Sequence, residues 1–300
     1  MGNPLVSIIT ITRNRANIIS RAINSVLNQT YTNIEYIIVD GASTDETQDV
    51  VALFKDKRIK YFKLDENLPI PETINYGFEH SHGDYISFLD DDDEYLENKI
   101  ERQIELISRL PSEYGMVYCW MSYFDNETGA FKYVHNCQLK GDVGIDVVER
   151  PTVSGTPTFL IKRDAFAQSG GWRNVGIVSD WEYGARFCQK YKVDFVPESL
   201  VKVYVNHGCQ RMSDWGYYRS QNKHHIQFHK YFLLEYEDIF KKYPRKKFFH
   251  LYRLALLYFC DGQILNFFKS YLELMKIKPS LKNLFIPVRA ITMWYGQKYK

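Results

Sequence analysis

The chain has 300 residues, a length typical of one large domain with a smaller additional part. Hydrophobic residues make up 45% of it and aromatic residues 16%, which excludes a mainly disordered protein. The net charge of +2 conceals a split, because residues 216–300 contain 16 Lys/Arg against 5 Asp/Glu, whereas residues 1–215 contain 22 against 31. We expect an acidic body followed by a basic region that meets an anionic partner.

The five cysteines are widely spaced and form no CxxC pair, which indicates a reducing compartment without disulfides or structural zinc. The apolar start of the chain reaches Arg13 too early for a signal peptide and is typical of a first strand. No apolar run in the sequence approaches the roughly 20 residues that a membrane-spanning helix needs. We therefore expect a cytoplasmic protein.

Strand and helix patterns alternate through the first part of the chain. Runs rich in β-branched residues predict four buried strands, over 5–12, 34–39, 59–64 and 85–89. Helical periodicity predicts helices over 18–29 and 72–80, and residues 43–46 (STDE) fit a capping box for a further helix that continues to Phe54. This alternation is typical of an α/β protein that has a parallel sheet with helices on both faces.

The pattern beyond residue 94 is less regular. We expect helices over 95–109, 164–169 and 180–191, strands over 116–124, 158–162, 193–196 and 200–205, a hairpin turn at 125–129, a bend at 170–172 and a loop over 135–155. From residue 217 the pattern predicts helices only, over 217–243, 246–260, 262–277 and 281–297. We therefore divide the chain into an α/β domain, 1–215, and a basic, aromatic-rich helical region, 216–300.

The fourth predicted strand runs directly into four carboxylates, those of Asp90, Asp91, Asp92 and Asp93. Like charges this close raise one another's pKa values, so they remain ionised most easily beside a cation. Oxygen ligands on a short turn suit Mg²⁺ or Mn²⁺, which keep several waters and share other positions with phosphate. In an open α/β sheet the ligand crevice lies at the carboxyl ends of the strands, where these acids stand. A solvated acidic turn before a helix is the alternative.

Several short motifs follow one another along the chain. They are 6–14 (VSIITITRN), 28–31 (NQTY), 39–45 (VDGASTD), 89–93 (LDDDD) and 170–172 (GGW) followed by 179–182 (SDWE). In this order they resemble the family 2 glycosyltransferases of the GT-A fold. The resemblance covers about residues 5–215. It implies a Rossmann-like, mostly parallel sheet flanked by helices, here with an all-helical C-terminal extension. It also implies transfer of a sugar from a nucleotide-diphosphate donor with inversion at the anomeric carbon.

The resemblance implies a role for each carboxylate of the acidic turn. Asp92 would bind the Mg²⁺ or Mn²⁺ ion directly, which would neutralise charge on the departing diphosphate. Asp90 and Asp91 would reach the ribose hydroxyls or bind the ion through water. Asp93 would steady the turn.

The nucleobase pocket implied by the family lies at the ends of the first two strands. Thr12 and Arg13 follow the first strand, and Asp40 ends the second, where it can accept a hydrogen bond from a uracil or guanine N–H. The family often has a second acid where Gly41 stands, so the base is open. We favour a UDP-sugar, with a hexosyl or N-acetylhexosaminyl group to transfer.

Asp180 is the predicted general base, because inverting transfer needs one carboxylate that takes the proton of the acceptor hydroxyl. The structural alternative is an N-cap of its helix, which Asp favours, and both can hold. His207 and Arg211 are predicted to contact the diphosphate or the metal from a closing loop, although a lone His is more often structural. Trp181 and Glu182 are expected to shape the acceptor site or to pack.

The helical region offers two further patterns. His225 and His229 have the i, i+4 spacing of a zinc-binding helix, but no HExxH pattern or third ligand accompanies them, so we expect a solvated helix face. Residues 241–249 interleave cations with aromatics, which is typical of helices on an anionic membrane surface. A helical subdomain with its own aromatic core is the alternative. No motif indicates nucleic-acid binding.

These inferences together predict a metal-dependent inverting glycosyltransferase of bacterial cell-surface polysaccharide synthesis. A glycan or a polyprenyl-diphosphate-linked acceptor would place it on the inner face of the cytoplasmic membrane as a peripheral protein. One alternative is a non-catalytic scaffold subunit that binds a sugar nucleotide or a glycan. A nucleotidyltransferase is a third hypothesis, but it would normally show a Gly-rich phosphate loop, and residues 12–15 (TRNR) contain no glycine.

Overall fold

The computed structural model describes residues 2–151, 153, 155–176, 178–205, 221–280, 283 and 286–287. The chain divides into two compact units. The first comprises Met1–Gly144, Thr152–Asn174 and Ser179–Cys209, and the second comprises Ile145–Pro151, Val175–Val178 and Gln210–Lys300. The boundary predicted between residues 215 and 216 falls outside the described residues and stays a prediction.

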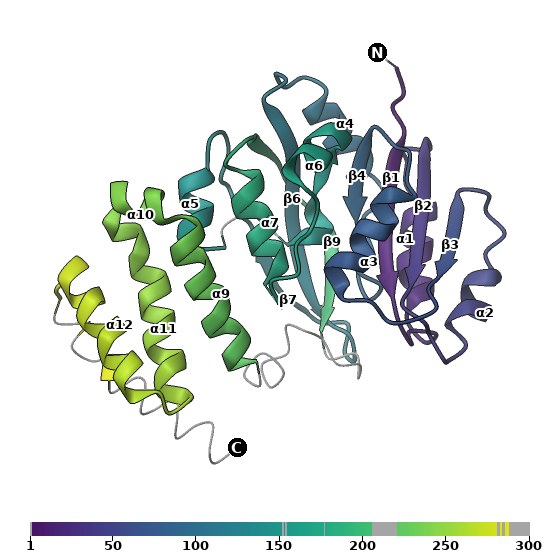
Figure 1. The fold of residues 1–300 in the computed structure, drawn as a ribbon. Helices are drawn as coiled ribbons and strands as arrows, with labels where there is room; N and C mark the ends of the chain where they lie inside the picture. The colour runs from purple at the N-terminus through teal and green to yellow at the C-terminus, as the bar shows by residue number, and fades with distance from the viewer. Residues whose placement is uncertain are drawn as a thin grey trace. The chain divides into compact units, whose positions relative to one another are not determined.

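The first unit is built on one mixed sheet (Figure 1). Its strand order is β3-β2-β1-β4-β8-β6-β9-β5, and β7 pairs with β6. The strands are β1 (Val6–Thr12), β2 (Ile34–Asp40), β3 (Ile59–Lys63), β4 (Tyr85–Phe88), β5 (Glu94–Tyr95), β6 (Tyr114–Asp125), β7 (Phe131–His135), β8 (Leu160–Lys162) and β9 (Lys192–Val205). The pairs β1–β2, β2–β3, β1–β4 and β6–β9 are parallel, whereas β8 is antiparallel to β4 and β6. The predicted α/β class is confirmed.

Helices cover both faces of this sheet, as the sequence predicted. Side chains alternate across a strand, so Ile8 and Ile9 of β1 face opposite layers. Ile8 belongs to a core with α1 (Ile19–Leu27), α2 (Thr47–Ala52) and α4 (Lys99–Ile107). On the other face Ile9 meets α3 (Ile70–Glu79), where a Cβ added to Gly77 would lie 2.7 Å from Ile9 Cγ2. Glycine therefore sets the close approach of α3 to the sheet.

The predicted capping box at 43–46 is wrong. The helix α2 begins at Thr47, and no side chain caps it at Glu46. Asp45 instead accepts hydrogen bonds from the main-chain N–H and the hydroxyl of Thr47, at 3.1 and 2.5 Å. Its other oxygen accepts one from the main-chain N–H of Ala16 at 3.2 Å. The acidic side chain thus joins the β2–α2 loop to the loop after β1, a long-range use that the local pattern did not predict.

Three other predicted boundaries also differ. Residue 95 is not helical, because β5 forms there and pairs with β9 before α4 begins. The loop predicted over 135–155 contains the helix α5 (Gly144–Glu149). The two strands predicted over 193–196 and 200–205 are one strand, β9, whose pairing with β6 shifts register around Trp120.

The second unit is helical, as predicted. It contains α9 (Asn222–Glu235), α10 (Glu237–Lys242), a 3₁₀ turn (Pro244–Lys247), α11 (Phe248–Cys260) and α12 (Ile264–Ile277). Its core is formed by residues of α9, α11 and α12, among them Leu254, Ala255, Phe267 and Leu274. Most of the helix predicted over 281–297 lies outside the described residues. None of the described helices combines the length and the apolar character that crossing a bilayer would take.

Two buried histidines join α9, α11 and residues 145–151 inside this unit. His250 Nε2 lies 2.8 Å from the carbonyl oxygen of Val148, and His250 Nδ1 lies 3.0 Å from His229 Nδ1. A carbonyl only accepts, so His250 carries its proton on Nε2 and accepts the Nδ1 proton of His229. The His250 ring is neutral in this arrangement, because one of its nitrogens donates and the other accepts. Burial lowers the pKa of His250 to about 4 and that of His229 well below its usual range.

This pair predicts that acid destabilises the protein below about pH 6.5. Between pH 6.5 and 4, His250 is protonated in the unfolded chain but largely neutral in the folded protein. The free energy of unfolding therefore falls as the pH falls. Full protonation costs about 3 kcal/mol for a pKa lowered from 6.5 to about 4. Thermal unfolding from pH 7.5 to 4.5 should therefore show a shallower pH dependence for His250→Gln than for the wild type. Both proteins keep the nearby titratable and charged groups, His225, Glu149 and Arg253. An equal dependence of the melting temperature on pH in the two proteins would contradict a neutral, buried His250.

Candidate active site

The acidic turn begins where β4 ends, and the neighbouring strand fixes that point. The main-chain N–H of Leu89 donates to the carbonyl oxygen of Ile9 at 3.0 Å, and the hydroxyl of Thr10 donates to the carbonyl oxygen of Leu89 at 2.8 Å. Asp90 is therefore the first residue beyond the sheet. The turn closes by a 3.2 Å hydrogen bond from the N–H of Asp93 to the carbonyl oxygen of Asp90.

Three of the four carboxylates converge. One oxygen of each of Asp90, Asp92 and Asp93 lies within 4.8 Å of the others. Asp90 is exposed, whereas the side chains of Asp92 and Asp93 are buried. Asp93 Oδ1 also accepts the N–H of Tyr204 at 3.2 Å, which ties the turn to β9. Three hard oxygen donors, two of them largely withdrawn from water, form a ligand set that fits Mg²⁺ or Mn²⁺.

Asp91 points to a different environment. Its Oδ1 lies 3.6 Å from Nε of Arg15, in the loop after β1. Burial, followed by the neighbouring carboxylate of Asp92, raises the pKa of Asp91 to about 7. The sequence analysis did not select Arg15, although its place in the TRNR segment offered a signal. Its guanidinium is a cation already positioned beside the acidic turn.

A buried polar cluster of Ser87, Tyr95 and Lys99 holds the end of β4, from which the acidic turn begins. Ser87 and Tyr95 are within hydrogen-bond distance at 2.9 Å, and the Tyr95 hydroxyl also donates to the carbonyl oxygen of Phe88. Lys99 Nζ donates to Ser87 Oγ at 2.9 Å and lies 4.0 Å from the centre of the Tyr95 ring. Burial lowers the pKa of Lys99 to about 7. These residues read as an ordinary strand and helix in the sequence, so only the fold brings them together.

Thr12, Arg13 and Asp40, the predicted nucleobase residues, lie at the ends of β1 and β2. Thr12 and Asp40 are register partners at the ends of β1 and β2, and Arg13 is exposed. Asp40 is wholly buried, and its oxygens accept the main-chain N–H of Ser43 at 2.8 Å and the hydroxyl of Tyr61. Asp40 therefore orders the loop that follows β2, and its contact with a base stays a prediction.

Asp180 stands in the first turn of α7 (Ser179–Phe187), inside the helix rather than at its N-cap. Its Oδ1 accepts the N–H of Trp181 at 2.8 Å. The side chain is exposed to solvent. Desolvation by the surrounding protein nevertheless raises the pKa of Asp180 above its ordinary value. The exposed surface keeps the carboxylate accessible to an acceptor, and a raised pKa brings it closer to that of a useful base.

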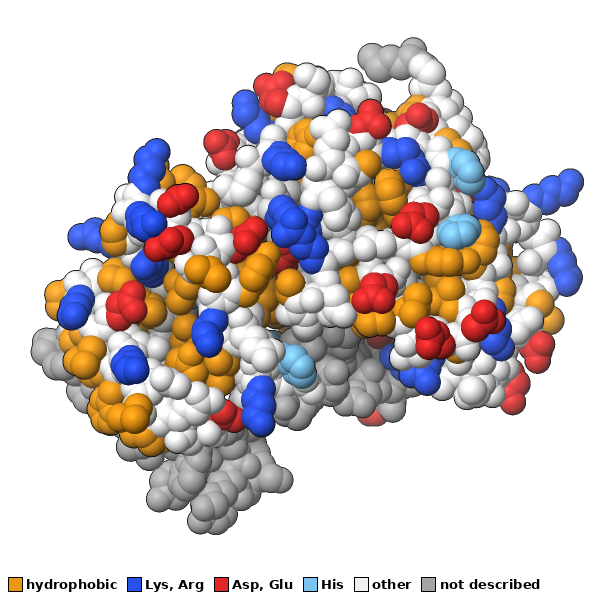
Figure 2. Space-filling model, in the orientation of Figure 1, with side chains coloured by type: hydrophobic (Ala, Val, Ile, Leu, Met, Phe, Trp, Pro, Cys, Tyr) orange, Lys and Arg blue, Asp and Glu red, His pale blue; other side chains and the backbone are white. Residues whose placement is uncertain are grey.

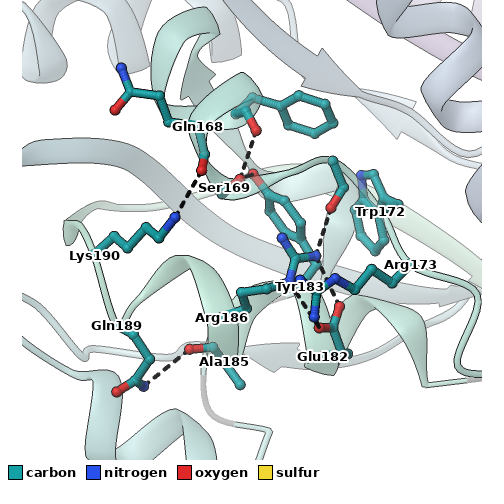
Figure 3. Close-up of polar contacts among 12 residues, drawn as sticks. Gln168, Ser169, Trp172, Arg173, Glu182, Tyr183, Ala185, Arg186, Gln189 and Lys190 are labelled. Carbon is teal, nitrogen blue, oxygen red and sulfur yellow. Dashed lines mark hydrogen bonds and ion pairs between the residues drawn. The ribbon is translucent and has the colours of Figure 1, made fainter.

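A buried ion pair holds α7 against the bend before it (Figure 3). Glu182 is wholly buried and receives two hydrogen bonds from Arg186, at 2.9 and 3.0 Å. Arg186 also donates to the carbonyl oxygen of Gly171 at 2.6 Å, and Arg173 lies 3.5 Å from the same carboxylate. Gly170 and Gly171 have φ of 83° and 62°, a conformation that favours glycine. Glu182 therefore packs and pairs, which was one of its two predicted roles.

Trp172 links the acidic strand to the helix that carries Asp180. Its ring stacks on Tyr183 of α7 with centroids 4.8 Å apart, and meets Phe88 of β4 edge-on at 5.9 Å. The side chain of Asn75 bonds both the N–H and the carbonyl oxygen of Trp172, at 2.9 and 2.8 Å. Aromatic contacts through Trp172 thus connect β4 and α7 within the first unit. A cleft shared by Asp92 and Asp180 stays a prediction.

Other predicted residues lie elsewhere. His207 and Arg211 fall outside the described residues. His225 and His229 are 1% and 2% exposed, so the expected solvated helix face is wrong. A cavity of about 270 Å³ occurs in the helical unit, lined by Lys223, Ile226, Gln227, Lys230, Tyr258, Gln263 and Asn266. None of these lining residues is an acid, so this cavity is not the candidate site at the acidic turn.

The comparison with known proteins agrees with this geometry. The family model described as Glycosyl transferase family 2 matches residues 7–168, more than half of the chain. The chain belongs to glycosyl transferase family 2. The matched range includes most of β1, all of β2 and the acidic turn, and it ends before Asp180.

Relatives and a solved structure extend this result. The uncharacterized glycosyltransferase RT0329 of Rickettsia typhi is 32% identical over 208 residues, 68% of this chain and 65% of that protein. The putative teichuronic acid biosynthesis glycosyltransferase TuaG of Bacillus subtilis is 32% identical over 168 residues, 55% of this chain and 65% of that protein. The chain therefore spans slightly less than two thirds of each relative. The structure of S. aureus TarS 1–349 in complex with UDP-GlcNAc has a TM-score of 0.62, with 14% identity and coverage of 90% and 91%. The GT-A fold is confirmed.

Proposed function

We propose that this family 2 protein is a metal-dependent inverting glycosyltransferase. It moves a hexosyl or N-acetylhexosaminyl group from a nucleotide-diphosphate sugar to a hydroxyl of a glycan or a polyprenyl-diphosphate-linked acceptor. The observation that carries the proposal is the convergence of the Asp90, Asp92 and Asp93 carboxylates within 4.8 Å at the end of β4. A solvated acidic turn would not require two of these carboxylates to be buried.

The acidic turn would hold the donor. Asp92 is the direct ligand of Mg²⁺ or Mn²⁺ in this proposal, and Asp90 and Asp93 supply further oxygens. The ion, when bound, provides Lewis-acid stabilisation of the diphosphate as it leaves. Arg21 fixes the turn from α1, because its Nη2 donates to the carbonyl oxygen of Asp92 at 2.6 Å. Asp90 and Asp91 remain candidates for the ribose hydroxyls.

Asp180 would act on the acceptor. The acceptor hydroxyl oxygen forms its bond to the anomeric carbon while the bond from that carbon to the diphosphate oxygen breaks. The hydroxyl proton passes to the Asp180 carboxylate, and the electron pair of the broken bond leaves with the diphosphate. Attack from the face opposite the leaving group inverts the anomeric configuration. An exposed carboxylate with a raised pKa suits this role.

Two findings support the donor class and the setting. The TarS structure contains UDP-GlcNAc, and that of the mannosyltransferase PcManGT from Pyrobaculum calidifontis contains GDP-Man and Mn²⁺, which supports a nucleotide-diphosphate sugar as the donor here. TuaG is named for teichuronic acid biosynthesis, which supports a role in bacterial surface polysaccharides. We place the protein in the cytoplasm, at the inner face of the membrane where such acceptors are presented.

A thermal-shift screen of nucleotide sugars with Mn²⁺ or Mg²⁺ tests the proposal. A ligand that binds only the folded state stabilises it by about 2.7 kcal/mol at 100 times its Kd. We expect a UDP-sugar to raise the melting temperature only when the metal is present. A set of donors that leaves the melting temperature unchanged with either metal would contradict the donor site. Binding without turnover in any acceptor mixture would favour the scaffold alternative.

A further inference from the structure

The helix α12 presents two apolar faces, and among the residues that the structure describes only one of them packs into a core. Phe267 and Leu274 are 1% and 0% exposed and belong to the core of the helical unit. The opposite side carries exposed apolar residues, which we call the α12 outer face: Ile264, Leu265, Phe268 and Leu272, with exposed fractions of 46%, 80%, 51% and 58%. Successive helix residues are about 100° apart, so these four side chains form one continuous strip.

Several exposed apolar side chains lie together on α12. The described residues include eleven large hydrophobic side chains that are exposed, and four of them lie within nine consecutive positions of α12. Exposed leucines elsewhere, such as Leu53 and Leu234, do not belong to a strip of this kind. Isolated exposed leucines need no explanation, whereas a contiguous apolar strip marks a surface that meets another phase or molecule.

Cations border the strip. By helical spacing, Lys269 and Lys276 follow its edge one after the other, and both are exposed. The acid beyond them on the helix, Glu273, lies 3.8 Å from Lys247 and is therefore partly neutralised. Figure 2 shows hydrophobic and cationic side chains gathered together over the helices α11 and α12. A helix with Leu and Phe on one face and Lys beside it is typical of an interfacial helix on an anionic bilayer.

Residues 241–249 are the run that the sequence pattern predicted to bind a membrane surface, but two of its lysines form ion pairs within the protein. Lys246 is engaged by Asp146 and Glu149, at 3.0 and 2.6 Å. Lys241 pairs with two acids of its own helix, Glu237 and Asp238. Lys241 and Lys246 are therefore already paired with acids of the same chain. The strip on α12 combines exposure, apolar character and bordering lysines in one place.

We propose that the α12 outer face docks the protein on an anionic membrane surface. Leu265, Phe268 and Leu272 would enter the boundary between headgroups and acyl chains, with Lys269 and Lys276 at the level of the lipid phosphates. A second copy of the chain is a weaker occupant, because four side chains of one helix supply far less than the roughly 800 Å² per partner of a stable interface. The proposal does not depend on the transfer reaction.

Co-sedimentation of the full chain with vesicles tests this surface. We expect the wild type to bind vesicles of phosphatidylcholine with phosphatidylglycerol, and to bind pure phosphatidylcholine vesicles much less. The triple variant Leu265→Glu/Phe268→Glu/Leu272→Glu should bind the anionic vesicles roughly tenfold less or weaker still. Lys269→Gln/Lys276→Gln, which keeps the apolar strip, should lose about fivefold per cation at low salt. Leu53→Glu/Leu234→Glu is the matched control, because both leucines are exposed by about the same fraction as Leu265.

Two results would overturn the proposal. One is a wild type that does not sediment with anionic vesicles, or a triple variant and a lysine variant that both sediment as the wild type does. The other is light scattering that finds a wild-type dimer and a monomeric triple variant, which would assign the strip to a second copy. Circular dichroism of each variant confirms its helix content before binding is measured. Activity on a soluble acceptor should be unchanged in the triple variant.

Discussion

Asp180→Asn is expected to lower sugar transfer by roughly 10²–10⁴-fold while donor binding is retained. The amide keeps the size of the side chain and can still lie in the first turn of α7, but it cannot take a proton from the acceptor hydroxyl. The exposed position of Asp180 means that no buried partner is lost on substitution. The fold should therefore remain intact.

The measurement for Asp180 separates chemistry from binding. Initial rates of nucleotide release with an acceptor report transfer, and calorimetric titration of the donor with metal reports binding. Asp164→Asn is a matched control, since Asp164 is also an exposed acid in the first turn of a helix of this unit, α6 (Arg163–Ser169). A variant of Asp180 that transfers sugar at the wild-type rate would remove it from the reaction.

Asp92→Asn is expected to abolish the metal-dependent rise in melting temperature produced by the donor, and transfer with it. The substitution removes one charged oxygen donor from the three that converge at the turn. The loss of transfer should reach at least roughly 10²-fold, because the diphosphate would leave without charge neutralisation. Without metal, the variant should be as stable as the wild type or more stable, since like charges then repel less.

Asp92→Asn also changes a neighbour in a defined direction. The Asp92 carboxylate helps to raise the pKa of Asp91, so the amide should bring the Asp91 pKa down from about 7. Titration followed by carboxyl NMR shifts can test this. Full retention of metal-dependent donor binding in Asp92→Asn, with the Asp164→Asn control unchanged, would place the ion at other residues.

The part of the site that the sequence predicted depends on local order along the chain. An apolar run followed by acids predicts a strand end with carboxylates, and the β1–β4 pairing places Asp90 at that edge. The pattern could not predict that Asp91 lies apart from the other three carboxylates. Asp91 faces Arg15, a contact across 76 positions of sequence that depends on the register of β1 and β4. The same limit hid the cluster of Ser87, Tyr95 and Lys99.

The helical unit shows where periodicity was sufficient and where it was not. Apolar spacing predicted α11 and α12, because each buries a regular stripe. It could not predict that His229 is buried, because its partner His250 lies on another helix. The carbonyl oxygen of Val148, which completes that contact, belongs to a short helix whose six residues are too few to show periodicity.

The central claim is most directly tested by a crystal structure of the protein with Mn²⁺ and a UDP-sugar. We expect an anomalous peak for manganese at roughly 2.1 Å from a carboxylate oxygen of Asp92, with the diphosphate on the same ion. The Asp180 carboxylate should face the anomeric carbon from the side opposite the diphosphate, with room for an acceptor hydroxyl between them. Manganese bound away from the acidic turn, or an Asp180 carboxylate that opens to a separate surface, would contradict the account.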